Sequence, residues 1–512
     1  MDTIFVGRGR LTELDVVTVA RYGAGVQLDP EAVERIAASR AVVDALAGDS
    51  EAHYGISTGF GALATMHIPA GDRGRLQQSL IRSHAAGLGP EVEREVVRAL
   101  MLLRLATLAT GHTGVRPRTA ATLAALLDVG ITPVVHEYGS LGCSGDLAPL
   151  AHVALTLLGE GMVREPSGRL APAAEALRTH GIAPVTLAEK EGLALINGTD
   201  GMLGHLLLAC HDIELLLRTA DITASMSVEA TLGTDRVFAA DLQELRPHPG
   251  QADAAANMRA LLADSPIIAS HAGPDCAYVQ DAYSMRCAPQ VAGAARDTLA
   301  HARAVSGREL AAAIDNPVVL DGRVESNGNF HGAPIGYVLD FLAIVVADLA
   351  SMSERRTDRM LDVARSRGLP PFLAGEPGVD SGHMIAQYTQ AALVSELKRL
   401  AVPASVDSIP SSAMQEDHVS MGWSAGRKLR RAVDGLAQVL AVELLTGARA
   451  LDLRAPLRPG PATAAVLETV RATVPGPGAD RYLAPELEEA VRIVRTGAAV
   501  IAANSALKSP LQ

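Results

Sequence analysis

The sequence predicts a mainly α-helical protein, in which a long central helix bundle follows an N-terminal domain rich in loops. Ala and Leu supply most of the apolar content, while aromatic residues make up only 3% of the 512 residues, and this composition favours helices packed closely on helices. Apolar residues recur at helical spacing over long segments, and the period-two alternation of half-buried strands is scarce. Polar, glycine-rich stretches separate these segments and are expected to be loops.

The first long helix is predicted over 30–47. Asp29 is placed to cap it, Pro30 takes the first helical position and Gly48 ends it. A second helix is predicted within 90–111, which a proline opens and a glycine closes. The predicted buried face of the first helix consists of Val33, Ile36, Ala37, Val43 and Leu46.

The longest helical periodicity covers 186–233, and shorter stretches of the same kind follow it. They lie around 290–310, 335–362, 385–400 and 425–450. The glycine-rich loops are expected at 55–61, 139–145 and 326–334, and the Pro/Gly-rich segment 163–184 is expected to be a surface excursion. Because long helices dominate only after residue 200, we expect two domains, 1–200 and 201–512.

Charge and cysteine content exclude several classes of protein. The formal net charge is −12, and no basic stripe with interleaved aromatic residues is present, so nucleic-acid binding is not expected. An acidic surface also repels anionic lipid, and the apolar run 341–350 is too short to span a bilayer, so a membrane location is not expected. The N-terminus lacks the basic start and apolar stretch of a signal peptide. The four cysteines, which form no CxxC pair, suggest a reducing compartment, and a cytoplasmic location is expected. They are Cys143, Cys210, Cys276 and Cys287.

The stretch GSLGCSGDLAPLAH, residues 139–152, admits several interpretations. Its glycines do not have the GxGxxG spacing of a dinucleotide loop, and Asp146 stands where a GxSxG nucleophile elbow needs glycine. Cys143 could be a nucleophile if a base lies nearby. The simplest alternative is a tight turn before a helix that Asp146 caps.

A fifth interpretation is chemical. If the amide nitrogen of Gly145 attacks the carbonyl carbon of Cys143, a five-membered ring closes. Loss of two waters then removes the Ser144 hydroxyl and leaves an exocyclic methylene, an electrophile that no standard side chain offers. Glycine at the third position supplies an unhindered amide and the sharp turn, and Asp146 could assist closure.

This stretch resembles the prosthetic-group motif of the histidine and aromatic amino acid ammonia-lyases, which make 4-methylideneimidazole-5-one (MIO) from Ala-Ser-Gly. Cys143 stands in place of Ala and would become a ring substituent. The resemblance extends over nearly the whole chain through five further motifs in the family's order.

In HYGISTGFG (53–61), Ser57 stands where Asn is common, and the resemblance implies that Tyr54 is the base that takes the β-proton. A phenol, with a pKa of about 10, needs its anion stabilised for this.

Two further motifs bear on the substrate ring. SHAAGLG supplies Ser83 and His84, a pair that is similar to the one in histidine-specific members, whereas phenylalanine and tyrosine lyases tend to carry Leu at the second position. QEDHVSMG supplies Glu416, where phenylalanine lyases tend to carry Gln. A carboxylate suits the N–H of an imidazole. Taken alone, His84 would be a structural histidine and Glu416 an acid at a helix start.

The remaining motifs would hold the other end of the substrate. By resemblance, Asn197 of INGTDG contacts the amino or carboxylate end, and Asp200 stands where Gln is common. Gln280, Tyr283 and Arg286 are expected on one helix, with Arg286 as the bidentate partner of a carboxylate and Tyr283 assisting near the prosthetic group. Phe330 of SNGNFHG would pack against the prosthetic ring. Alone, these motifs would indicate a turn, a polar helix face and a core phenylalanine.

The resemblance therefore implies a carbon–nitrogen lyase that forms MIO, eliminates ammonia from L-histidine without oxidation, and gives trans-urocanate, the entry to histidine degradation. It implies a helical homotetramer whose active sites take residues from three chains, with no external cofactor or metal. His205, Cys210 and His211 lie along a predicted helix at spacings that do not converge on a metal. Three alternatives stay open, namely a tyrosine or phenylalanine ammonia-lyase, a 2,3-aminomutase, and a helical scaffold that never forms the ring.

Overall fold

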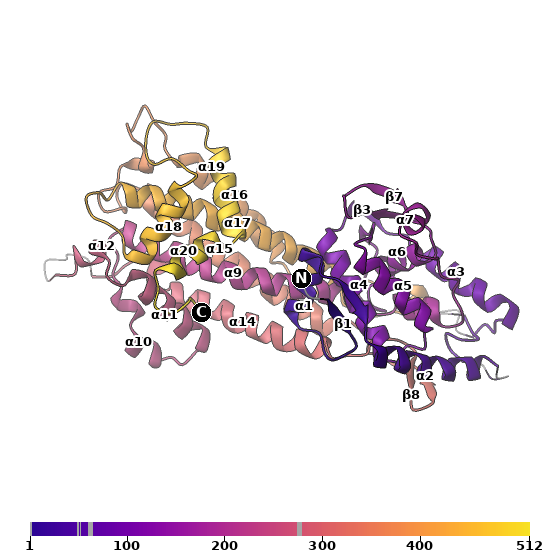
Figure 1. Cartoon of the computed structure of the whole chain (residues 1–512). Coiled ribbons are helices and arrows are strands. Elements are labelled where there is room, and N and C mark those ends of the chain that lie inside the picture. Colours follow the sequence, from indigo (N-terminus) through magenta and orange to yellow (C-terminus); the bar gives the residue numbers. More distant parts are fainter. Residues whose placement is uncertain (1–2, 49–50, 52, 60–64, 274–278) are drawn as a thin grey trace. The chain divides into compact units, whose positions relative to one another are not determined.

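The structure is a computed structural model that describes residues 3–48, 51, 53–59, 65–273 and 279–512. The chain divides into two compact units, each built from three stretches of sequence (Figure 1). The first unit comprises Met1–His211, Ala302–Asp340 and Pro403–Arg427. The second comprises Asp212–His301, Phe341–Val402 and Lys428–Gln512. The division at residue 200 stays a prediction.

The first unit is built around a buried helix, α4 (Arg94–Ala109), which packs against α1, α2, α5 and α6. The sequence forms this helix because eleven of its sixteen residues are Ala, Leu, Val or Met, and they leave almost no polar face. Figure 1 shows it among the indigo and purple helices. The other helices of this unit are α1 (Glu13–Tyr22), α2 (Pro30–Ala47), α3 (Arg73–His84), α5 (Pro117–Asp128), α6 (Leu147–Leu157), α7 (Ala173–Thr179) and α8 (Glu191–Ile196).

All strands of the described chain are short and lie in the first unit. β1 (Ile4–Val6) pairs with β2 (Val26–Leu28) in parallel, and the other pairs are antiparallel. β3 (Leu88–Glu91) pairs with β5 (His136–Tyr138), and β6 (Met162–Arg164) lies between β4 (Thr132–Pro133) and β7 (Leu170–Pro172). β8 (Val318–Leu320) and β9 (Arg323–Glu325) form a hairpin.

Four long helices belong partly to each unit: α9 (Asp200–Ala230), α14 (Ala288–Glu309), α15 (Ala333–Leu361) and α17 (Gly422–Asp452). The remaining helices lie in the second unit. They are α10 (Ala240–Glu244), α11 (Pro249–Leu262), α12 (Pro266–Ala269), α13 (Tyr283–Arg286), α16 (Met384–Leu400), α18 (Pro461–Arg471), α19 (Ala484–Arg495) and α20 (Ala498–Ser505). Single 3₁₀ turns cover Ala70–Asp72, Arg236–Phe238, Pro371–Leu373 and Ser412–Met414.

The predicted fold class is confirmed, and so is the first helix. Asp29 accepts a hydrogen bond from the amide of Glu31, and α2 ends before Gly48. Its predicted buried face is partly wrong, because Ala37 is exposed while Arg40 is buried. The Arg40 guanidinium is held inside by the carbonyls of Gly114 and Glu189.

Three other predicted elements differ from the structure. The helix within 90–111 begins only at Arg94, because Pro90 belongs to β3. The long segment 186–233 is broken at 197–199, between α8 and α9. The excursion 163–184 contains β7 and α7 as well as loops.

The apolar run 341–350 lies within α15, a helix of 29 residues that is long and apolar enough to cross a membrane by length and composition. The expectation that this region is too short to span a bilayer was therefore wrong about its length. In its most apolar window, 61% of the residues are buried in the protein, as in the core helix of a soluble protein.

Candidate active site

A cavity of about 1130 Å³ in the first unit collects side chains from motifs that are distant in the sequence. It is lined by polar groups from several separate segments of the sequence and by apolar side chains of α3, such as Leu76 and Leu80. The predicted site residues that line it are Tyr54, Ser83, His84, Cys143, Ser144, Asn197, Phe330 and Glu416. Of the HYGISTGFG motif, Phe60 and Gly61 lie outside the described residues, as does Cys276.

The turn at Cys143–Ser144–Gly145 is tight, and glycine is required at its third position. Gly145 has φ +78°, and a Cβ there would lie 2.1 Å from the carbonyl oxygen of Gly198. The amide of Asp146 donates to the same oxygen at 2.7 Å. The turn is therefore fixed against the 197–199 break between α8 and α9.

Asp146 follows this turn and is completely buried. It occupies the N-cap position of α6, but its side chain makes no capping hydrogen bond, so the interpretation of Asp146 as a simple cap is wrong. Its carboxylate instead accepts hydrogen bonds from Ser140 Oγ at 2.8 Å and from the amide of Met202 at 2.9 Å. Burial raises the pKa of Asp146 to about 7, so this group can hold or release a proton beside the turn near neutral pH.

The Glu416 carboxylate faces the turn from another segment. Cys143 Sγ donates to Oε2 at 3.0 Å, Ser144 Oγ donates to Oε1 at 3.1 Å, and Ser411 Oγ donates to Oε2 at 3.0 Å. Burial, together with the nearby Glu416 charge, raises the pKa of Cys143 to about 12. A thiol that stays protonated is a poor nucleophile, which argues against Cys143 as a catalytic nucleophile.

His84 is the last residue of α3 and lies half-buried on the cavity wall. Its Nδ1 lies 2.9 Å from the carbonyl oxygen of Leu80. Because a carbonyl can only accept, Nδ1 carries the proton and Nε2 is left as an acceptor. Burial lowers the pKa of His84, more than the Leu80 carbonyl and the Glu416 charge raise it, and this favours the neutral ring.

Asn197 ends α8 and is almost completely buried. Its Nδ2 donates to the carbonyl of Asn316 at 2.8 Å, whereas its Oδ1 has no hydrogen-bond partner among the described residues. An unsatisfied buried acceptor next to a cavity is unfavourable unless a ligand or water completes it. Asn197 is therefore suited to accept a hydrogen bond from a bound molecule.

Gln280, Tyr283 and Arg286 belong to the second unit. Tyr283 is 69% exposed, and the Arg286 guanidinium lies 4.6 Å from the centroid of its ring. The prediction of a single helix for all three was wrong, because α13 begins only at Tyr283. Asp281 accepts a hydrogen bond from the amide of Thr234 and one from Arg367, and these contacts hold the preceding segment in a non-helical conformation.

Two histidines of the cavity were not predicted from the sequence. His331 and His418 line it with stacked rings whose centroids are 5.6 Å apart and whose planes differ by 7°. The only signal was their position, because His331 follows Phe330 and His418 lies two residues after Glu416. Their pairing depends on contacts between distant segments, which the sequence did not reveal.

Comparison with known proteins gives a consistent result. Residues 11–472 match the family described as aromatic amino acid lyase. The chain is 66% identical to "Histidine ammonia-lyase" of Streptomyces coelicolor over 507 residues, which cover 99% of each protein. Among solved structures, it is similar to a tyrosine aminomutase from Streptomyces globisporus, with TM-score 0.93, 39% identity, and coverage of 99% of this chain and 100% of the other. It is also similar to a histidine ammonia-lyase from Trypanosoma cruzi, with TM-score 0.91, 38% identity, and coverage of 99% and 96%.

Proposed function

Because the chain belongs to the aromatic amino acid lyase family, we propose that it eliminates ammonia from L-histidine and yields trans-urocanate. The observation that carries this proposal is the presence of His84 and Glu416 in the same cavity as Ser144. Both are polar groups that can contact an imidazole. This reaction opens histidine degradation.

The prosthetic group would be MIO, formed from Cys143, Ser144 and Gly145. The residues fit this group, because Gly145 adopts a conformation that only glycine tolerates there and the Ser144 side chain lines the cavity. Asp146, buried behind the turn, could hold a proton during ring closure. The group would supply an electrophile that a protein of standard side chains lacks.

The protein's own residues would bind the substrate and move its proton. Glu416 would accept a hydrogen bond from the imidazole N–H, and His84 would contact the same ring. Ring formation consumes the Ser144 hydroxyl, which leaves Glu416 Oε1 open to a new donor. Asn197 Oδ1 would accept from the amino end of the substrate, and Tyr54 would take the β-proton.

Gln280, Tyr283 and Arg286 would complete the site in a homotetramer. Tyr283 and Gln280 are exposed, so they are available to a neighbouring copy. Arg286 Nε is buried without a hydrogen-bond partner among the described residues, and a substrate carboxylate would supply one. Phe330 would pack against the prosthetic ring. We expect the tetramer to act in the cytoplasm.

The test is the ultraviolet absorbance of purified protein with L-histidine, L-tyrosine or L-phenylalanine in separate cuvettes. A rise with L-histidine alone is expected, and Ser144→Ala should abolish it without unfolding the protein. A rise with either of the other two amino acids would overturn histidine as the substrate. Chromatography for β-amino acids would identify an aminomutase, and an intact mass without the loss of two waters would indicate a scaffold that never forms the ring.

A further inference from the structure

A buried ion pair lies behind the cavity wall and takes no part in the chemistry assigned above. Arg104 is completely buried in α4, and its Nε lies 3.3 Å from Oδ2 of Asp200 at the start of α9. Burying two charges carries a large desolvation cost, which the attraction between them does not always offset. Stability alone therefore does not explain why the two charges are buried here.

The hydrogen bonds of Arg104 all go to backbone carbonyls, in two segments that each contribute residues to the substrate cavity. Nη1 donates to the carbonyls of Asn197 at 2.9 Å and Ala194 at 3.2 Å, and Nη2 donates to the carbonyl of Ile314 at 2.8 Å. Asn197 lines the cavity, and Asn316, two residues after Ile314, accepts the side-chain hydrogen bond of Asn197. One guanidinium thus holds both segments that fix the Asn197 amide.

Gly198 lies against the same ion pair. A Cβ at this position would lie 2.5 Å from Asp200 Oδ2 and 2.7 Å from Arg104 Nη2, so the backbone could not approach the pair if residue 198 carried a side chain. The carbonyl of Gly198 accepts from the Asp146 amide on its other side. The 197–198 segment is therefore clamped between the ion pair and the ring-forming turn.

From these contacts, we propose that Arg104 and Asp200 are positioning residues, which fix the 197–198 segment so that Asn197 meets the substrate and Gly198 holds the ring-forming turn. The part that concerns the substrate rests on the function proposed above, whereas the clamp itself does not. Asp200 Oδ2 forms an ion pair with the guanidinium, 3.3 Å from Nε and without a hydrogen bond between these two atoms, while both Nη atoms donate to the carbonyls. The attraction between the two charges therefore keeps the guanidinium at this place.

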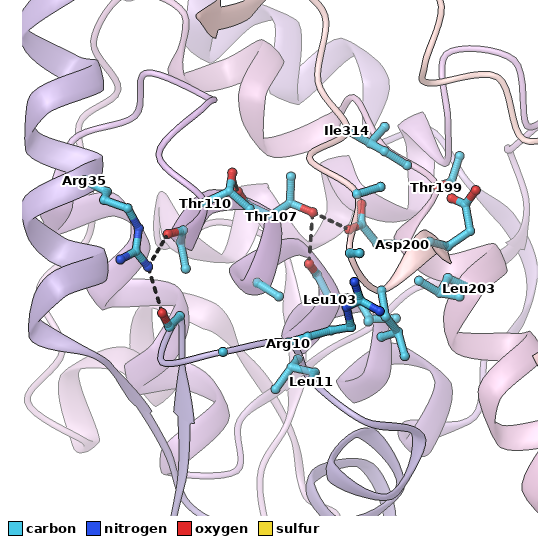
Figure 2. Close-up of a pocket in the computed structure, with 18 residues that line it drawn as sticks. Arg10, Leu11, Arg35, Leu103, Thr107, Thr110, Thr199, Asp200, Leu203 and Ile314 are labelled. Carbon is cyan, nitrogen blue, oxygen red and sulfur yellow. Dashed lines mark hydrogen bonds between the residues drawn. The ribbon is translucent and has the colours of Figure 1, made fainter. Parts of the chain in front are cut away.

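A second, smaller cavity gives solvent access to the region of Asp200. It has a volume of about 290 Å³, and Asp200, Thr107, Thr199, Leu203 and Glu309 are among its lining residues. Figure 2 shows Thr107 between the Leu103 carbonyl and Asp200, with a dashed line to each. If the Asp200 side chain is truncated, a small carboxylate such as formate can enter this cavity and replace it.

The experiment uses Asp200→Ala and the milder Asp200→Asn in the full-length protein, with Glu309→Gln as the control. Glu309 lines the same cavity and also carries a carboxyl group, but no hydrogen bond or ion pair joins it to Arg104 among the described residues. Amide hydrogen exchange of the peptide covering 194–200 is measured with and without formate. Turnover of L-histidine is measured in parallel, and intact mass gives the fraction of each protein that bears the ring.

We expect amide hydrogen exchange of the 194–200 peptide to be faster than wild type in both Asp200 variants. In Glu309→Gln, the exchange rate of this peptide should be unchanged. Turnover per ring-bearing protein should fall roughly 10- to 100-fold, as for other small misplacements of a substrate-binding group. Formate should restore slow exchange and part of the turnover in Asp200→Ala, but not in Asp200→Asn, where the side chain still fills the space.

Unchanged exchange in Asp200→Ala, or exchange that formate does not slow again, would overturn the proposal. If exchange responds as expected while wild-type protein releases no product from any amino acid, the clamp stands and the proposed function fails. If exchange responds but turnover per ring-bearing protein stays within twofold of wild type, the pair does not position Asn197, and that part of the proposal is refuted.

Discussion

Replacing Glu416 by Gln tests the residue on which the choice of substrate depends most. The substitution keeps the shape of the side chain and removes its charge. In the structure, this carboxylate accepts three hydrogen bonds, from Cys143, Ser144 and Ser411. In the enzyme that bears the ring, the imidazole N–H of the substrate would donate to this carboxylate in place of the Ser144 hydroxyl. A hydrogen bond to a charged acceptor contributes about 1.5–3 kcal/mol.

Since each 1.36 kcal/mol is a factor of ten in rate, kcat/KM for L-histidine should fall roughly 10- to 150-fold in Glu416→Gln. The assay is the initial rate of urocanate absorbance, divided by the fraction of protein that bears the ring. Asp417→Asn is the matched control, because Asp417 is a neighbouring carboxylate that also lines the cavity. A Glu416→Gln variant whose kcat/KM stays within threefold of wild type would refute the role of this carboxylate in recognising the imidazole.

Three further predictions concern other parts of the molecule. Lys190→Met should destabilise the protein by about 3–5 kcal/mol in urea unfolding, because it leaves Asp315 charged and completely buried; the double change with Asp315→Leu should cost clearly less. Gly145→Ala should prevent ring closure, because its Cβ would collide with the carbonyl of Gly198, and an intact mass that still lacks two waters would contradict this. The pKa of His383 is lowered to about 3 in the folded protein, chiefly by burial and then by nearby arginines. Below the unfolded pKa of 6.5, the unfolded chain therefore binds a proton at His383 that the folded protein does not, and this lowers the free energy of unfolding. Between pH 7.5 and 5.5, wild type should therefore lose about 1 kcal/mol more stability than His383→Gln, and equal losses would show that His383 is not the group responsible.

The sequence predicted those features that depend on local pattern. Apolar periodicity predicted α14, α15, α16 and α17 close to their observed bounds, because each is a long amphipathic or apolar stretch. The motifs also supplied eight side chains that the structure brings into one cavity. Chemistry was readable at the ring-forming turn because this motif combines Ser144 with a glycine that the backbone needs, Gly145.

What the sequence did not reveal depends on pairs of residues that lie far apart in the chain. Nothing local to Arg104 indicates that its guanidinium meets the carbonyls of Asn197 and Ile314, which lie 93 and 210 residues away. The helix predicted through Gln280 failed for the same reason, since the partners of Asp281 are Thr234 and Arg367. Arg104 lies in an apolar stretch of sequence. A charged residue in such a stretch indicates that it has a partner, but it does not indicate which distant residue that partner is.

The position of the buried charges suggests why the protein retains them. Lys190 pairs with Asp315 at 2.6 Å, and Asp315 Oδ1 accepts from the amide of Asn316, whose carbonyl fixes the Asn197 amide. Arg104 holds the same residue from another direction, because its Nη1 donates to the backbone carbonyl of Asn197. Apolar replacements of both partners in such pairs are often neutral or stabilising, so stability alone does not account for two of them around one side chain. A hydrogen-bonded charge network has few alternative arrangements, whereas an apolar core can repack, and this difference favours charges where a substrate-binding group must be held in one place. The double change of Lys190 and Asp315 described above should therefore separate the two effects: urea unfolding should recover most of its stability relative to Lys190→Met, while kcat/KM should remain low.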